Sequence, residues 1–321
     1  MVAPLRASCS LLRLSSVLCV FLLAVSLSFA APGQQLTPSS PPSTAELKAR
    51  AESGDASAQQ QLSQFLLRGD SAVPGYDLAL AWLRAAAQSD PRAQFLLGYL
   101  YEHGQGVPQD YAKAAENYRA AALQHHPSAE NNLGLLYQRG QGVPKDMDKA
   151  FEWFSAAAQH GNPVAQCHLA VLYSLGSGTV RDYKEAAKWF RAAADSGFPE
   201  AQNSLGIYYY IGLGVAMDYR EAARWLRLAA QQGLPDAETN LAFLYEQGKG
   251  VPLDYVAAYT WYSRAIAAGD LTAKPRLKSL SLIMSRKQLD RATALVEAQV
   301  ATPPSPAPTS SSAGSPYVSG P

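Results

Sequence analysis

Residues 129–161 read AENNLGLLYQRGQGVPKDMDKAFEWFSAAAQHG and contain the pattern that decides the fold. Ala129, Leu133 and Tyr137 are spaced four residues apart, so on a helix they fall on one stripe. Two glycines then interrupt the helix, and Asp146 is placed to accept hydrogen bonds from the free N–H groups at the start of a second helix. The stretch therefore predicts two helices joined by a tight turn.

The same pattern recurs along the chain, at a spacing of 35 residues once and of 36 residues five times. Its blocks begin at Ala58, Ala93, Ala129, Ala165, Ala201, Ala237 and Ala273. Each unit is an antiparallel helix pair with an apolar flank that stays exposed until the next pair covers it. We therefore predict an all-α fold, a right-handed superhelical α-solenoid of about six 36-residue helix–turn–helix repeats over residues 58–272.

The recurring motif A-x-x-x-L-G-x-L-Y-x-x-G-x-G-V-x-x-D-Y-x-x-A-x-x-W-x-x-A-A resembles the Sel-one-like repeat (SLR) family, which is related to the tetratricopeptide repeats. The resemblance covers about two thirds of the chain. The first unit departs from the motif, with Asp70 and Ser71 in its loop and Gly75 where the capping aspartate belongs. We expect this departure to weaken the loop geometry without changing the fold.

The segments outside the repeats are expected to differ from them. Residues 43–57 begin with the spacing of a capping box and predict an N-terminal capping helix, and residues 273–300 predict a pair of C-terminal capping helices. Residues 31–42 and 301–321 are uncharged and rich in Pro, Ser and Thr, which predicts a flexible linker and a disordered tail.

The N-terminus has the pattern of a signal peptide. Two arginines precede an uncharged run at residues 14–31, and Ser28 and Ala30 supply the small residues of a cleavage site. We predict that residues 1–30 are a signal peptide and that the protein is secreted or periplasmic. An uncleaved N-terminal membrane anchor is the alternative. Cleavage would leave Cys167 as the only cysteine, which excludes an intrachain disulfide.

Composition and histidine placement argue against several classes of function. The chain has 27 Lys and Arg against 26 Asp and Glu, so it lacks the basic excess that nucleic-acid binding requires. Cys167 and His168 are adjacent, and consecutive helical residues point about 100° apart, which disfavours a catalytic pair. His125 and His126 fall at a turn between units, where a turn pair is favoured over a metal site. We therefore expect a monomeric protein without catalytic residues, metal or small-molecule cofactor.

The framework residues of the motif are expected to form the core, so binding is sought at positions that vary between units. The Tyr and Trp columns could be read as an aromatic platform, but their fixed register favours core packing. In tetratricopeptide-like stacks the first helix of each pair lines the concave face. By that analogy, the predicted peptide groove consists of Phe95, Tyr99, Asn131, Gln138, Val171, Asn203, Tyr210, Thr239 and Phe243.

Two asparagines of this set are singled out by their chemistry. The side-chain amides of Asn131 and Asn203 can both donate hydrogen bonds to an extended peptide backbone and accept them from it. The alternative, that they are solvated helix residues, remains open at this point.

These features favour an exported scaffold or adaptor that binds a protein or peptide segment in its concave groove. One alternative is a hydrolase that acts on cell-wall material or binds β-lactams, because some SLR members with paired cysteines have been linked to that activity. This chain lacks paired cysteines in its repeats. A further alternative is an N-terminally anchored organiser of a membrane complex.

Overall fold

The computed structural model describes residues 42–68 and 75–301, and every regular element within these ranges is helical. The α-helices are α1 (Thr44–Glu52), α2 (Ala56–Leu67), α3 (Tyr76–Ala86), α4 (Pro91–His103), α5 (Tyr111–Ala122), α6 (Pro127–Arg139), α7 (Met147–Gln159), α8 (Pro163–Leu175), α9 (Tyr183–Asp195), α10 (Pro199–Ile211), α11 (Tyr219–Gln231), α12 (Pro235–Gln247), α13 (Tyr255–Ala267), α14 (Lys274–Ile283) and α15 (Arg286–Ala301), with a short 3₁₀ helix, η1 (Leu271–Ala273), before α14. The predicted signal peptide, nearly all of the predicted linker and tail, and Asp70 and Ser71 lie outside the described residues.

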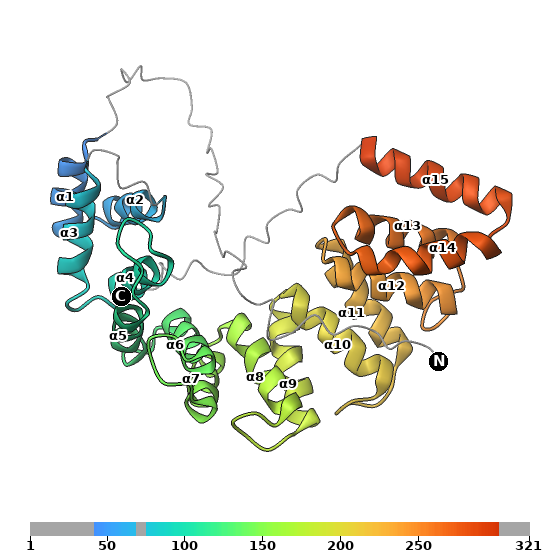
Figure 1. The fold of residues 1–321 in the computed structure, drawn as a ribbon, viewed down its shortest axis with the longest axis horizontal. Helices are drawn as coiled ribbons and strands as arrows, with labels where there is room; N and C mark the ends of the chain where they lie inside the picture. Colours follow the sequence, from blue (N-terminus) through green and yellow to red (C-terminus); the bar gives the residue numbers. More distant parts are fainter. Residues whose placement is uncertain (1–41, 69–74, 302–321) are drawn as a thin grey trace, which may run out of the picture. The chain divides into compact units, whose positions relative to one another are not determined.

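The described chain falls into two compact units, one with α1 to α8 that ends at Asp182 and one with α9 to α15 that begins at Tyr183. Within each unit, helices form antiparallel pairs, such as α4 with α5 and α12 with α13 (Figure 1). Each pair also contacts the next one along the chain, for example through α5 and α6 or through α11 and α12. This arrangement confirms the predicted all-α solenoid class. No helix of the described ranges is both long and apolar enough to cross a membrane.

The first helix of each repeat from α4 to α12 begins at a proline and ends at a glycine. Proline fits the first helical position because its missing N–H has no intrahelical partner there. In α4 and α8, the preceding Asp90 and Asn162 accept a hydrogen bond from a free backbone N–H. The closing glycines have φ between 64° and 73°, the left-handed region that ends a helix without a Cβ clash.

The second glycine of each turn contacts the preceding repeat. Gly142 has φ +69°, and a Cβ on it would lie 2.1 Å from the carbonyl oxygen of Tyr111, the first residue of α5. The glycine pair therefore serves two purposes, because one member ends the helix and the other lets the loop pack against its neighbour.

Close packing within a pair depends on the small residue that follows the motif leucine. A Cβ on Gly134 in α6 would lie 2.9 Å from the ring of Phe154 in α7, which is fully buried. The other glycine positions of this column, Gly98 and Gly206, meet Tyr118 and Leu226 at similar distances. This confirms that the small residue allows the second helix to approach.

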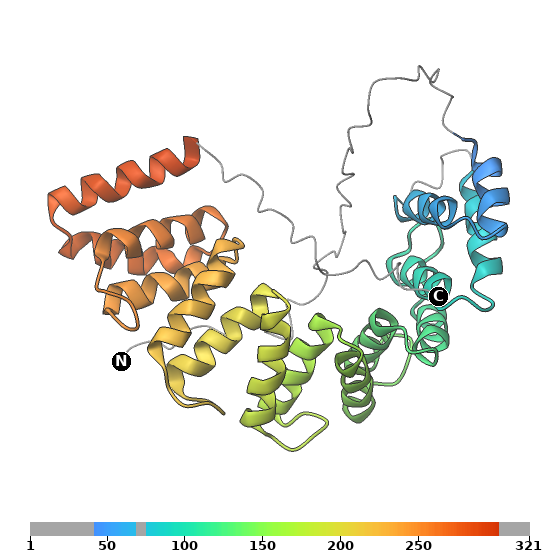
Figure 2. The ribbon, with the colours of Figure 1, turned by 180° about the vertical axis from the view of Figure 1, so that it is seen from behind.

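The ends of the described chain are covered by helices outside the repeats. At the N-terminus of α1, Ser43 and Glu46 form a capping box. At the other end, both α14 and α15 contact α13 (Figure 2). Gly75, at the start of α3, has φ +92° and provides no side-chain cap, which agrees with the departure of the first unit from the motif.

Candidate functional site

The two asparagines predicted to bind peptide are buried between repeats. Asn131 is 6% exposed, and its Oδ1 lies 3.0 Å from Nδ1 of His168 in the next repeat. Asn203 is fully buried, and its Oδ1 accepts a hydrogen bond of 2.9 Å from Nδ2 of Asn240. In this packing the amides join consecutive repeats and are not presented to a ligand. The expectation that they line an open groove is therefore corrected, because the following first helix packs directly over them.

Three more members of the predicted groove are buried in the same way. Val171 and Phe243 are 7% and 3% exposed, and the guanidinium of Arg276 lies 4.7 Å from the centre of the Phe243 ring. Thr239 donates a hydrogen bond of 2.7 Å to Asp270 at the start of η1. These side chains contribute to packing and do not form an open surface.

The remaining predicted residues are partly exposed. Phe95 stacks on the imidazole of His126 at 4.9 Å, and Tyr99 stacks on His103 at 4.0 Å. Burial, with Glu102 as a second cause, raises the pKa of Tyr99, so its hydroxyl stays neutral. Gln138 is half-buried in α6.

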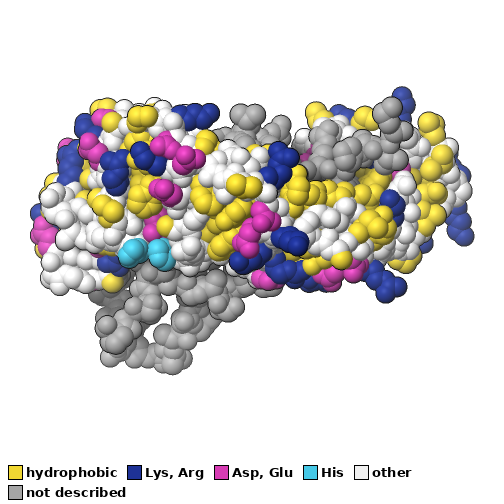
Figure 3. All heavy atoms as spheres, turned by 90° about the horizontal axis from the view of Figure 1, so that it is seen from below, with side chains coloured by type: hydrophobic (Ala, Val, Ile, Leu, Met, Phe, Trp, Pro, Cys, Tyr) yellow, Lys and Arg dark blue, Asp and Glu magenta, His cyan; other side chains and the backbone are white. Residues whose placement is uncertain are grey.

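Tyr210, at the end of α10, belongs to a cationic and aromatic cluster. Its hydroxyl accepts a hydrogen bond of 2.8 Å from Lys249 Nζ, which raises the pKa of that lysine. The same ammonium lies 5.1 Å from the ring centre of Tyr219, within cation–π range. Basic, acidic and hydrophobic side chains are interspersed on the face shown in Figure 3, without a large region of one charge.

The tyrosine column joins repeats through arginines. Tyr137 accepts a hydrogen bond of 2.9 Å from Arg119 in the preceding second helix. Tyr245 accepts one of 3.1 Å from Arg227 in the same relation. The hydroxyls of these tyrosines are thus occupied within the stack, as expected for framework residues.

Cys167 and His168 are also interior. Cys167 is fully buried, and His168 is 3% exposed with its ring against Phe154. Burial, assisted by Arg139, lowers the pKa of His168 to about 4, so its imidazole is neutral at ordinary pH. A buried, neutral histidine beside a buried thiol offers a substrate no access.

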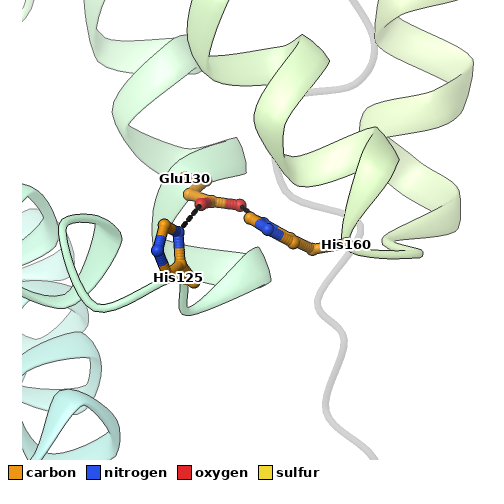
Figure 4. A group of neighbouring side chains, drawn as sticks. All are labelled: His125, Glu130 and His160. Carbon is orange, nitrogen blue, oxygen red and sulfur yellow. Dashed lines mark hydrogen bonds and ion pairs between the residues drawn. The ribbon is translucent and has the colours of Figure 1, made fainter.

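A row of polar pairs was not expected from the sequence. The residue after the repeat alanine reaches the residue 30 positions later, as in Gln94 with Gln124 and Gln202 with Gln232. In the third repeat the pair is Glu130 with His160, and His125 lies on its other side (Figure 4). The constant separation of 30 residues between the paired positions is the sequence signal that would have found this cluster.

In the last repeat, an arginine pairs with the buried carboxylate at this position. Glu238 is almost fully buried and lies 2.8 Å from the guanidinium of Arg264. Burial raises the pKa of Glu238 to about 7, although the arginine opposes that shift.

Helix pairs of nearly constant length, joined to their neighbours by recurring residues, define an α-solenoid repeat protein. Comparison with protein families finds six Sel1 repeats, at residues 56–90, 91–126, 127–162, 163–198, 199–234 and 235–270. The chain therefore belongs to the Sel1 repeat family, which confirms the resemblance seen in its motif.

Two solved structures support this assignment. A protective antigen of uropathogenic Escherichia coli with an SLR fold is 34% identical, with a TM-score of 0.69 over 81% of this chain. This chain covers 57% of that antigen. A Sel1 repeat protein from Oxalobacter formigenes is 32% identical, with a TM-score of 0.63, and the match covers 72% of this chain and 96% of that protein. Comparison with curated proteins finds no match.

Proposed function

We propose that this protein is an exported scaffold or adaptor that binds a protein segment on the first helices of its repeats. Sel1 repeat proteins generally act as scaffolds for protein–protein interaction. The observation that carries the proposal is a difference in exposure between recurring and non-recurring side chains. The recurring residues are engaged between helices, while a few non-recurring aromatic and amide groups on the first helices keep exposed surface.

Burial of the two asparagines limits the proposed surface to fewer residues. In the unit of α1 to α8 it comprises Phe95, Tyr99 and Gln138, which are all partly exposed. In the unit of α9 to α15 it comprises Tyr210 with its partner Lys249. Aromatic side chains bury much area at a small entropic cost, which is why they often dominate binding surfaces.

Site-specific photo-crosslinking in the native host tests this surface. A photoreactive amino acid replaces Tyr99 or Gln138 on first helices, and Glu116 or Glu152 on second helices serves as the matched control. We expect a defined protein adduct at the first pair of positions and none at the control positions. Adducts of equal yield at all four positions, or none at any, would contradict the proposed surface.

The rival hydrolase function is tested with the same purified protein. Because Cys167 and His168 are buried, we expect no turnover of nitrocefin above the uncatalysed rate. Turnover that follows the protein through purification would favour the hydrolase instead.

A further inference from the structure

The turn between α5 and α6 holds a residue of unusual conformation. Later repeats have glycine at this place, namely Gly161, Gly197, Gly233 and Gly269, all with positive φ. The second repeat has His125 instead, with φ 61°, and it is the one non-glycine residue with positive φ among the described residues. A side chain is disfavoured in this conformation relative to glycine, so the imidazole is present at an energetic cost. Such an outlier points to a role for the side chain beyond the turn.

The side chain beside His125 is a buried carboxylate. Glu130, in the first turn of α6, has a side chain that is 1% exposed. Its Oε2 lies 2.8 Å from Nδ1 of His160, and its Oε1 lies 3.9 Å from Nδ1 of His125. No lysine or arginine of the described ranges forms an ion pair with Glu130, in contrast to Glu238 with its arginine. A buried carboxylate requires a compensating positive charge, and among the residues that the structure describes only the two imidazoles are paired with it.

The three side chains converge from three segments: the α5–α6 turn, α6 and the C-terminal end of α7 (Figure 4). One ligand atom from each lies within 4.8 Å of the others. Ligands around a tetrahedral zinc ion with bonds of about 2.0–2.1 Å are about 3.3 Å apart. The atoms of His160 and Glu130, 2.8 Å apart, must therefore separate by about 0.5 Å, and the wider pairs must close by up to about 1.5 Å. The imidazoles can make this adjustment, because the side chains of His125 and His160 are 76% and 37% exposed.

We propose that His125, Glu130 and His160 form a binding site for a divalent transition-metal ion of the zinc class. Two imidazole nitrogens and one carboxylate suit such ions, whereas Mg²⁺ and Ca²⁺ prefer oxygen ligands. Three protein ligands leave a fourth position for water or for a side chain of a partner. Binding would displace the proton between His160 and Glu130, and the ion would supply the charge that the buried carboxylate lacks.

The neighbouring histidine belongs to the helix cap and not to this site. His126 Nδ1 accepts the backbone N–H of Ala129 at 3.2 Å, and its ring stacks on Phe95. The sequence-based preference for a turn role over a metal site therefore suits His126. His125 differs from His126, because its ring lies beside the carboxylate of Glu130 and the ring of His160 in the next turn. The proposed ion would cross-link two consecutive inter-repeat turns, whose histidine side chains are 76% and 37% exposed.

The test uses the untagged full chain after treatment with a chelator. Titration with Zn²⁺ in a calorimeter should show one site per chain, and Zn²⁺ should raise the melting temperature. His125→Gly restores the residue that later repeats have at this turn, so the metal-free variant should melt no lower than the wild type. It should nevertheless lose affinity for Zn²⁺ by about 100-fold and lose the metal-induced shift, because one of three ligands is gone.

A second variant and a control separate this site from general surface binding. Glu130→Gln keeps a hydrogen-bonding pair like Gln94 with Gln124 but removes the carboxylate, and it should also lose the metal-induced shift. His103→Gln removes a histidine outside the cluster and should bind Zn²⁺ like the wild type. The proposal would be overturned if the wild type showed no stoichiometric binding, or if His103→Gln reduced the affinity as much as His125→Gly did.

Discussion

Gly142 illustrates how a single residue can hold two repeats together. Its φ of +69° is unfavourable for other residues, and the space for a Cβ is taken by the main chain of Tyr111. Gly161 shares the positive φ, at +80°, but a Cβ there would meet nothing within 4 Å. Substitution of Gly161 therefore tests backbone strain alone, whereas substitution of Gly142 tests strain together with steric contact between repeats.

We expect Gly142→Ala to destabilise the protein more than Gly161→Ala. Strain alone should cost about 1–2 kcal/mol at Gly161, whereas the forced shift of packed main chain should add about 1–3 kcal/mol at Gly142. Urea unfolding followed by circular dichroism measures both variants. Equal midpoints would show that the loop can move away from Tyr111 and that this contact contributes nothing.

His168 makes stability depend on pH. Burial lowers its pKa to about 4 from 6.5, so between these pH values the unfolded chain binds more protons than the folded one. The contribution of His168 to the free energy of unfolding should therefore be constant above pH 6.5 and fall as the pH drops toward 4, by up to about 3 kcal/mol.

The variant His168→Gln removes this titration. The difference between its free energy of unfolding and that of the wild type, measured with urea from pH 4 to pH 7.5, should be constant above pH 6.5 and change by up to about 3 kcal/mol as the pH falls toward 4. Parallel pH profiles would mean that the imidazole accepts a proton inside the fold without cost.

At the scale of the element, the starts of the second helices α5, α7, α11 and α13 are each fixed by an aspartate. Asp110, Asp146, Asp218 and Asp254 each accept a backbone N–H bond from the first turn, as the sequence predicts. In Asp146 the backbone N–H of Lys149 lowers the pKa of the carboxyl, so the cap stays ionised at neutral pH and weakens only when acid protonates it.

Asp146→Ala should cost about 1 kcal/mol, because the free N–H groups of α7 lose their acceptor. Asp148→Ala removes the same charge from the same turn without removing a cap, and its cost should be only a few tenths of a kcal/mol. Thermal melts of the two variants check this difference. Equal melting temperatures would show that Asp146 stabilises α7 only through its charge near the helix N-terminus and not through its hydrogen bond.

At the scale of the whole molecule, the main contacts between the described helices of each unit join helix pairs that are neighbours along the chain. Stability in such a stack is a sum of repeat and interface terms, so a local defect should weaken adjacent repeats most. In Gly142→Ala we expect hydrogen exchange to accelerate most in α5, α6 and α7, and least in α1 and α2. Mass spectrometry of exchanged peptides measures this gradient. Uniform acceleration throughout α1 to α8 would instead indicate a single cooperative unit.

Export is the second prediction at this scale. The two arginines and the uncharged run at residues 14–31 predict cleavage by signal peptidase. N-terminal sequencing of the protein from its host should begin near Ala31. An intact Met1 on membrane-associated material would support the anchor instead.

The repeat could be predicted from the sequence because its determinants are local and recur in register. Proline at the start of a helix, glycine at its end and aspartate before the next one act on backbone groups within a few residues. The stripe of Ala, Leu and Tyr then identifies the face that packs. These features determined the class of fold, the family and the positions of the turns.

Only the tertiary structure decided which flanking residues are covered. The first helices α6 and α10 each pack against their own second helix and against the preceding repeat, so their buried arcs extend beyond the motif stripe and include Asn131 and Asn203. The cluster of His125, Glu130 and His160 joins residues up to 35 positions apart, and their approach depends on how consecutive helix pairs stack. Helical periodicity specifies direction around one helix, whereas contact between repeats depends on the separation of helices, which local sequence does not encode.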